Sequence, residues 1–217
     1  MTDLHSHLVP GVDDGAPELE SALEGLHRMV AAGFTRVVTT PHLDGSLTHD
    51  AEALERVLDT VGEAFRRLEE PARAAHPDLA LGQAFEVRMD VPEPDLSDPR
   101  LRFPGSPVVL VEWAALQVPP GSPRAVERLV AQGVRPLLAH PERYRGLDGR
   151  IELAAEWRAR GAWLQVNHGS LVGRYGPEVR RVAARLLARG WVDVLATDFH
   201  GRPRLPLYTE EARGWFE

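Results

Sequence analysis

One unit recurs along the chain: a helix-like segment ends near a glycine, and a short apolar run follows within a few residues. The unit occurs at Gly33, Gly133, Gly161 and Gly190. Glycine directly after a helix is a common C-cap, because it adopts the left-handed backbone conformation without strain. The apolar runs that follow are short and β-prone, which is typical of strands buried on both faces. This alternation predicts a parallel sheet with helices packed against it.

The predicted elements amount to about seven βα units. We expect strands near residues 2–5, 37–40, 81–87, 107–112, 136–139, 162–166 and 192–196, and helices near 18–32, 51–75, 123–131, 152–159 and 177–188. Such a series within 217 residues favours one domain spanning 1–217 with an α/β fold, a closed or nearly closed barrel. A doubly wound open sheet is the alternative.

Composition removes several classes of chemistry. The chain has no cysteine, which excludes disulfide scaffolds, thiolate metal sites and cysteine nucleophiles. All 25 basic residues are arginine, so P-loop nucleotide binding, protein-kinase chemistry and Schiff-base chemistry, which depend on lysine, are excluded as well. Covalent or metal chemistry must therefore use His, Asp, Glu, Ser, Thr or Tyr.

Charge and hydropathy indicate no contact with nucleic acid or lipid. The net charge of −7 gives no sign of a basic surface for nucleic acid. No apolar run reaches the roughly 18 residues of a transmembrane helix, so we expect no membrane insertion. The first residues lack the basic and apolar regions of a signal peptide, and we therefore expect a cytoplasmic protein. The sequence leaves the oligomeric state open.

Nearly every predicted strand carries or ends in a residue that could bind a metal ion. The carboxyl ends of parallel strands in a barrel converge on one face, so these side chains should meet in space. Residues two apart in an extended strand share a face. His5 and His7 have this spacing, and so do Asp198 and His200. Imidazoles and carboxylates without sulfur suit Zn, Mn, Fe or Mg. The candidates are His5, His7, His42, Glu86, Glu112, His140, Asp198 and His200.

Other titratable residues need separate treatment. Glu112 directly follows the apolar run 108–111, and a carboxylate there is costly to bury unless it is paired or binds a cation. His168 also lies at the end of a predicted strand, and its role stays open. The remaining histidines fall within or beside predicted helices and are expected on the surface: His27, His49 and His76.

Residues 3–15, DLHSHLVPGVDDG, resemble the opening of the capsule-type (CpsB/CapC-like) bacterial tyrosine phosphatases. These enzymes belong to the polymerase-and-histidinol-phosphatase (PHP) superfamily of metal-dependent phosphoesterases. The P-G-x-D-D-G and H-P-E-R-Y motifs are more specific than H-x-H, which the whole superfamily shares. The resemblance spans residues 3 to about 203 and continues through 40–42 (TPH), 111–112 (VE), 139–144 (AHPERY), 165–167 (QVN), 169–171 (GSL) and 197–200 (TDFH).

The resemblance implies a distorted (β/α)7 barrel, related to the TIM barrel, with three divalent cations. Manganese is the usual metal of the family, and zinc, iron or magnesium are other candidates. By motif, the first cation would be held by His5, His7, Glu86 and Asp198, the second by Glu86 as a bridge with Glu112 and His140, and the third by Asp14, His42 and His200.

The resemblance also implies which residues act on the substrate. Arg143 resembles the family's phosphate-contacting arginine, and Arg202 or Arg204 would be a second one. We expect catalytic roles for Arg143, His42 and Asp198. The implied reaction is hydrolysis of a phosphate monoester by a hydroxide that bridges two cations, without a covalent phosphoenzyme.

The implied substrate is the phosphotyrosine tail of a bacterial tyrosine kinase that controls capsule or exopolysaccharide synthesis. Two alternatives stay open. One is a phosphatase of the same superfamily that acts on histidinol phosphate or another small molecule, and the P-G-x-D-D-G motif favours the capsule type over it. The other is a non-catalytic metal-bound module of a larger complex, against which the complete set of nine ligand residues argues.

Overall fold

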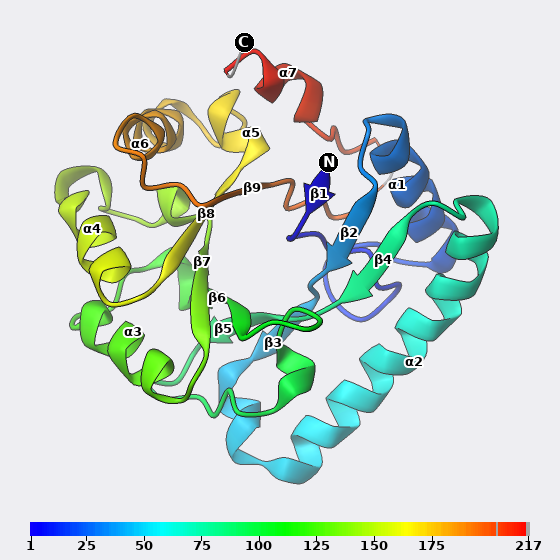
Figure 1. Cartoon of the computed structure of the whole chain (residues 1–217), viewed down its shortest axis with the longest axis horizontal. Coiled ribbons are helices and arrows are strands. Elements are labelled where there is room, and N and C mark those ends of the chain that lie inside the picture. The colour runs from blue at the N-terminus through cyan, green and yellow to red at the C-terminus, as the bar shows by residue number, and fades with distance from the viewer. Residues whose placement is uncertain (203, 216–217) are drawn as a thin grey trace.

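The computed structural model describes residues 1–202 and 204–215. Figure 1 shows the strands as an inner ring with the helices outside it. The strands are β1 (Thr2–Asp3), β2 (Arg36–Thr39), β3 (His42–Asp44), β4 (Ala80–Gln83), β5 (Glu86–Met89), β6 (Val108–Trp113), β7 (Arg135–Ala139), β8 (Trp163–Asn167) and β9 (Val194–Ala196). The α-helices are α1 (Leu19–Ala31), α2 (Ala51–Ala75), α3 (Ser122–Ala131), α4 (Glu152–Ala159), α5 (His168–Leu171), α6 (Pro177–Ala188) and α7 (Thr209–Arg213).

The strands form two groups that belong to one curved sheet. Hydrogen bonds link β1-β2-β4 in one group and β3-β5-β6-β7-β8-β9 in the other, and every pair is parallel. Two residues separate β2 from β3, and two separate β4 from β5. The register is the same on both sides of this break, since Thr39 pairs with Gln83 and His42 pairs with Glu86. The nine strands therefore act as seven strands of one barrel.

The barrel closes where the ends of β9 and β1 meet. The backbone N–H of Asp198 donates to the carbonyl of His5, and that of His7 donates to the carbonyl of Phe199, both at 2.8 Å. Below these contacts the buried carboxylate of Asp3 accepts hydrogen bonds from the backbone N–H of Thr197 at 2.7 Å and from its hydroxyl at 3.1 Å. A side chain thus replaces part of the backbone hydrogen bonding between β9 and β1. The predicted distorted (β/α)7 barrel is confirmed, and the alternative of a doubly wound open sheet is wrong.

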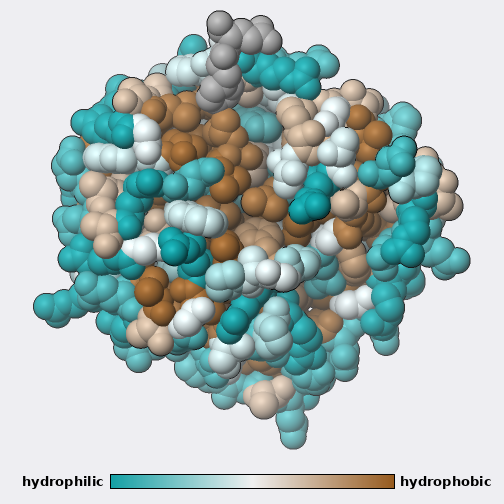
Figure 2. Space-filling model, in the orientation of Figure 1, coloured by the Kyte–Doolittle hydropathy of each residue, from teal (hydrophilic) through white to brown (hydrophobic). Residues whose placement is uncertain are grey.

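The helices bury their apolar faces against the outside of the barrel. Phe85, Trp113 and Trp157 are among the largest fully buried side chains of the main core, and burying each aromatic or aliphatic side chain contributes about 1.5–3 kcal/mol. Polar and charged residues cover much of the face that Figure 2 presents, and apolar residues gather toward its middle. Within residues 1–202 and 204–215, no helix has both the length and the apolar character needed to cross a bilayer.

The predicted bounds hold better for the helices than for the strands. Helices α2, α4 and α6 begin and end at the predicted residues, and the carboxylate of Asp50 caps α2 by accepting from the N–H of Ala53 at 3.0 Å. Strands β1 and β9 are shorter than predicted, because the contacts at the closure come from side chains and from the segments that follow. The short helices α5 and α7 were not predicted.

Candidate metal centre

All nine ligand residues named from the sequence lie in one cluster, and most follow or end the strands of the barrel. Each offers an atom within 4.8 Å of ligand atoms from at least two others, which gives four overlapping groups. The groups are His7, Asp14, His42 and His200; His5, His140 and Asp198; His5, His7 and Glu86; and His42, Glu86 and Glu112. The barrel thus brings together residues from both ends of the chain.

Glu86 stands at the middle of the cluster. It is the first residue of β5 and is 1% exposed. Its Oε2 lies 3.0 Å from His42 Nδ1, 3.3 Å from His5 Nε2 and 3.4 Å from His7 Nε2. Its Oε1 lies 3.2 Å from His140 Nε2. One carboxylate therefore faces four imidazoles, which is the arrangement expected of a residue that bridges two cations.

The orphaned atoms of the cluster fit divalent cations. Glu86 Oε2 and His42 Nδ1 are buried and close, but neither has a partner in hydrogen-bond geometry among the described residues. An unpaired buried polar atom costs about 1–3 kcal/mol, so it calls for a partner. Lone pairs that converge without a shared proton suit a cation, and imidazole and carboxylate donors suit manganese, iron, zinc or magnesium.

The pKa values of the innermost groups follow from their mutual charges. Burial alone would raise the pKa of Glu86, but the charge of His5 and hydrogen bonds from neighbouring imidazoles hold it well below its usual value. Burial would lower the pKa of His5, but the carboxylates of Glu86 and Asp198 raise it to about 9. The pKa of His7 is raised well above its ordinary value, against burial, by the hydrogen bond to Asp13 and by the charge of Glu86.

The pKa values of the surrounding candidate ligands are shifted by other causes. Burial would raise the pKa of Asp198, but His5, His140 and Arg143 hold it at about 2. Burial and the charge of Glu86 raise the pKa of Glu112 to about 7. Burial and the guanidinium of Arg143 lower the pKa of His140 to about 4, so this imidazole is neutral at pH 7. A neutral imidazole can bind a cation directly, whereas a protonated one must first lose its proton.

Asp13 contacts the cluster, and the sequence analysis did not name it as a candidate. Its Oδ2 lies 2.7 Å from His7 Nδ1 and accepts from the backbone N–H of His42 at 3.1 Å, and its Oδ1 accepts from the N–H of Gly15 at 2.9 Å. The contact with Nδ1 fixes the tautomer of His7, so that Nε2 faces the cluster. A Cβ at Gly15 would lie 2.2 Å from the carbonyl oxygen of His7, which explains the glycine that ends the P-G-x-D-D-G motif.

A second positioning network runs along β8. Gln165 Oε1 lies 2.9 Å from His5 Nδ1, and Gln165 Nε2 donates to Asn167 Oδ1 at 2.7 Å. Asn167 Nδ2 then donates to Asp198 Oδ2 at 2.8 Å. All four side chains are buried, so the chain of amides links ligands from opposite ends of the sequence. Polar residues that alternate in an otherwise buried strand were the available signal for this network.

Arg143 lies beside the cluster, as predicted. Its Nη1 donates to Asp198 Oδ2 at 2.7 Å, and its guanidinium carbon lies 4.5 Å from the ring centroid of Tyr175. The preceding Glu142 is buried and accepts from the Ser170 hydroxyl at 2.6 Å and from the backbone N–H of Asn167 at 3.0 Å. These contacts attach the segment that carries Arg143 to β8 and α5.

Strained backbone accompanies two of the ligands. His140 has a φ of 31° and Asp198 has a φ of 50°, conformations that residues with side chains rarely adopt. The extended geometry predicted for Asp198 and His200 is therefore wrong. The turn at Asp198 still leaves the two side chains close, with His200 Nδ1 3.6 Å from Asp198 Oδ1. Asp198 also faces His5, while His200 Nε2 lies 3.3 Å from Asp14 Oδ1.

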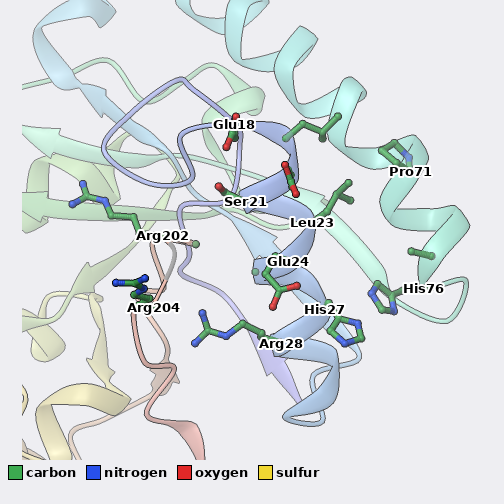
Figure 3. A pocket seen from close by; sticks show the side chains of 15 residues that line it. Glu18, Ser21, Leu23, Glu24, His27, Arg28, Pro71, His76, Arg202 and Arg204 are labelled. Atoms are coloured by element: carbon green, nitrogen blue, oxygen red, sulfur yellow. The ribbon is translucent and has the colours of Figure 1, made fainter.

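The remaining predicted residues lie at or beyond the rim. Arg202 is exposed, and its Nε donates to the backbone carbonyl of Asp14 at 2.6 Å. Arg204 is exposed and points into a groove beside α1 (Figure 3). His168 begins α5, and its Nδ1 lies 3.2 Å from the Thr209 hydroxyl, outside the cluster. The structure thus brings Arg143 and Arg202 to the ligands, but not Arg204 or His168.

Comparisons with known proteins show the family of the chain. A profile of the family described as "Capsular polysaccharide synthesis, CpsB/CapC" matches residues 1–213. The chain belongs to the CpsB/CapC family. The tyrosine-protein phosphatase YwqE of Bacillus subtilis is 26% identical over 214 residues, which cover 98% of this chain and 82% of that protein. The tyrosine-protein phosphatase CpsB of Streptococcus pneumoniae is 26% identical over 226 residues, covering 98% and 88%. The resemblance read from the motifs is confirmed.

Solved structures support the same CpsB/CapC assignment. One belongs to a study of YwqE from Bacillus subtilis and CpsB from Streptococcus pneumoniae, described there as "unique metal-dependent tyrosine phosphatases". It matches with a TM-score of 0.78 at 26% identity and covers 98% of this chain and 84% of that one. A variant of the organophosphorus hydrolase from Deinococcus radiodurans matches with a TM-score of 0.50 at 17% identity, which is a likeness of fold alone.

Proposed function

We propose that this CpsB/CapC-family chain is a metal-dependent phosphatase that hydrolyses phosphotyrosine in proteins, as one domain spanning residues 1–217. The observation that carries the proposal is the convergence of nine His, Asp and Glu side chains beside the guanidinium of Arg143. Relatives named tyrosine-protein phosphatases match nearly the whole chain, which supports the same reaction here.

The proposed cofactor is a set of three divalent cations, with manganese as the first choice. His5, His7, Glu86 and Asp198 would hold one, Glu86, Glu112 and His140 a second, and Asp14, His42 and His200 a third. Bound divalent cations supply a Lewis acid that lowers the pKa of water and stabilises charge on the phosphate. Their charge exceeds that of the four carboxylates, so a phosphate dianion complements the site.

The residues around the ligands then bind and orient the phosphate. Arg143 has one N–H committed to Asp198, which directs the rest of its planar fork toward substrate oxygens. His42 faces Glu86 through Nδ1 and Asp14 through Nε2, so it fixes the distance between these two carboxylates. Arg202, held by the carbonyl of Asp14, is the second proposed phosphate contact. The ion pair thus gives Asp198 a role in orienting Arg143.

The chemistry of the leaving group suits a tyrosine ester. A phenol has a pKa near 10, so its departure needs only weak help from a proton donor. We propose the phosphotyrosine tail of a bacterial tyrosine kinase in capsule or exopolysaccharide synthesis as the substrate, and the cytoplasm as the place of reaction. The family's link to capsular polysaccharide synthesis supports this choice.

The test is to strip the protein of metal and measure hydrolysis before and after adding manganese. The substrates are p-nitrophenyl phosphate, a phosphotyrosine peptide, a phosphoserine peptide and histidinol phosphate. Activity restored by manganese, with the phosphotyrosine peptide preferred, is the expected result, and folded His140→Ala protein should have lost it. Preference for histidinol phosphate would favour the small-molecule alternative. Tightly bound metal without any turnover would favour the non-catalytic module.

A further inference from the structure

A long groove lies on the outside of the barrel, next to the rim of the metal centre. It runs between α1, the C-terminal part of α2, and Gly201, Arg202 and Arg204 (Figure 3). Its volume is about 1350 Å³. Pockets for small molecules measure about 300–1,000 Å³, so the groove is large for a metabolite and has room for several residues of polypeptide.

The groove has an apolar strip along its floor. Leu19 and Leu23 are one helical turn apart on α1 and therefore share a face, and Pro71 and Ala75 of α2 line the groove with them. Leu19 is 38% exposed, which is high for a leucine in a helix that packs on a barrel. Such a strip suits the side chains of an extended peptide better than a small charged metabolite.

Arginines gather on one side of the groove, although the protein as a whole carries a net charge of −7. Arg28, Arg202 and Arg204 line it together, and Figure 3 shows their side chains reaching into the same region. Glu18 just before α1, and Glu20 and Glu24 within it, also line the groove, and Figure 3 shows Glu24 beside Arg28. Over the whole groove three glutamates balance three arginines, and Arg28 already donates to the carbonyl of Leu205 at 2.6 Å. Negative charge on a bound chain is therefore favoured at the end formed by Arg202 and Arg204, of which Arg202 contacts the metal centre.

Arg202 joins the groove to the metal centre. Its Nη2 lies 3.4 Å from Asp14 Oδ2, while Asp14 Oδ1 lies 3.3 Å from His200 Nε2. One residue thus lines the groove and contacts the outer edge of the ligand cluster. The innermost ligands are fully buried, so a substrate presents its phosphate inward and keeps the rest of its chain on the rim.

We propose that this groove binds the polypeptide on one side of the phosphotyrosine, in extended form and with acidic residues nearest the phosphorylated tyrosine. The inference rests on the proposed phosphatase function and specifies its substrate class as a protein. The arginines pair with the acidic residues, and the apolar strip of α1 and α2 takes the side chains farther along. Binding energy from the groove then adds to that of the phosphate itself.

The experiment compares Leu19→Glu with Val130→Glu in the full manganese-loaded chain. Val130 is the matched control, because it is 37% exposed on α3, away from the groove. The kinetic constants are measured with p-nitrophenyl phosphate and with phosphotyrosine peptides that have acidic or neutral flanks. Leu19→Ser serves as a second, milder variant should the glutamate impair folding.

For the wild type, we expect kcat/KM to be higher for the acidic peptide than for the neutral one. Leu19→Glu should raise the KM for the acidic peptide by about three- to tenfold, the usual range for one interface side chain, and leave p-nitrophenyl phosphate unchanged. Val130→Glu should change neither. Light scattering should show the same oligomeric state for all variants.

Three results would overturn the proposal: an unchanged KM for the peptide, an equal loss for both substrates, or a change in oligomeric state that makes the groove an interface between copies of the chain. Failure of the proposed function looks different, since the wild-type protein would then either leave p-nitrophenyl phosphate intact or prefer histidinol phosphate to both phosphotyrosine peptides. The small substrate reports on the metal centre, and the difference between substrates reports on the groove.

Discussion

The ligand cluster has two parts that differ in their access to solvent. The inner ligands, His5, His7, Glu86 and Asp198, are between 0% and 6% exposed. The outer ligands are more open: the side chains of Asp14, His42 and His200 are 58%, 23% and 21% exposed. Each inner histidine has a buried partner on its second ring nitrogen, whereas Asp14 lies on a loop at the surface.

From this difference in exposure we infer that the two parts have different roles, one in holding cations and the other in the reaction. The inner part is positioned by hydrogen bonds that Asp13 and Gln165 accept and Asn167 donates, and such polar groups are costly to leave unpaired. The outer part lies beside Arg202 and the groove, where we propose that the substrate binds. We therefore expect the inner ligands to govern metal retention and the outer ones to govern reaction with the substrate.

The largest effect should come from Glu86→Gln. Glu86 faces four imidazoles, and the change removes the negative charge that draws cations into the inner part. We expect kcat to fall by on the order of 10³ and bound metal per chain to decrease. Elemental analysis after gel filtration, together with phosphotyrosine hydrolysis, checks this. Full metal content with normal kcat would show that Glu86 does not bridge cations.

Asp14→Asn should have a smaller effect of a different kind. The carboxylate is 58% exposed, so the free energy of unfolding should change by less than about 0.5 kcal/mol. We expect activity to fall by about 10- to 100-fold, with partial recovery at high manganese. A manganese titration of activity, with a denaturant melt as the control, measures both. Equal losses of activity for Asp14→Asn and Glu86→Gln would erase the distinction between the two parts.

Asp13→Ala tests how the inner part is positioned. Without the carboxylate, His7 loses the partner of its Nδ1 and the imidazole is free to change tautomer. We expect metal affinity to fall by about 10- to 100-fold, and Asp13→Asn to recover part of it because its carbonyl still accepts a hydrogen bond. Competition with a fluorescent chelator gives the affinities. Nitrogen-15 NMR of the imidazoles reports the tautomer, and an unchanged tautomer in Asp13→Ala would refute the role.

Tyr175 offers a weaker test at the substrate side. Its ring lies under the guanidinium of Arg143, and stacking of this kind contributes about 0.5–1 kcal/mol at exposed sites. Tyr175→Ala should raise the KM a few-fold, while Tyr175→Phe, which keeps the ring, should behave as the wild type. Steady-state kinetics with p-nitrophenyl phosphate decides this. A loss in Tyr175→Phe equal to that in Tyr175→Ala would point to the hydroxyl and not the ring.

His168 should affect activity least and reports instead on stability. Burial lowers its pKa to about 4, below the ordinary value of 6.5. The unfolded chain therefore binds a proton before the folded one does, so this contribution is complete above pH 6.5 and is lost as the pH falls toward 4. Between about pH 7.5 and pH 5, wild type should lose roughly 2 kcal/mol more than His168→Gln. Denaturant melts of both proteins in chelator test this, and parallel pH profiles would refute it.

The sequence predicted the ligands better than their supports. His5, His7, His140 and Asp198 belong to motifs whose residue types and strand-end places can be recognised without coordinates. Asp13 lies in the same motif as Asp14, but only the fold shows that it contacts His7 instead of the cluster. Similarly, nothing local to Gln165 predicts that its amide meets His5 from the other end of the chain.

The fold, like the cluster, was predicted where the signal is local in the sequence and missed where it depends on contacts between distant residues. The amphipathic pattern of α2 and α6 fixed their bounds, because helix periodicity is a local property. The closure of the barrel depends on Asp3 meeting Thr197, a contact between residues near opposite ends of the chain. Arg204 was paired with Arg202 as a phosphate contact from its place in the sequence, and the structure places it in the groove instead.

The most direct test of the metal centre is anomalous diffraction at the manganese edge from crystals of the manganese-loaded protein. We expect three peaks per chain: one among the inner ligands, one between Glu86, Glu112 and His140, and one between Asp14, His42 and His200. Asp14→Asn crystals should lose or weaken only the last peak. A single peak, or peaks away from these side chains, would contradict a cluster of three cations as the site of phosphate hydrolysis.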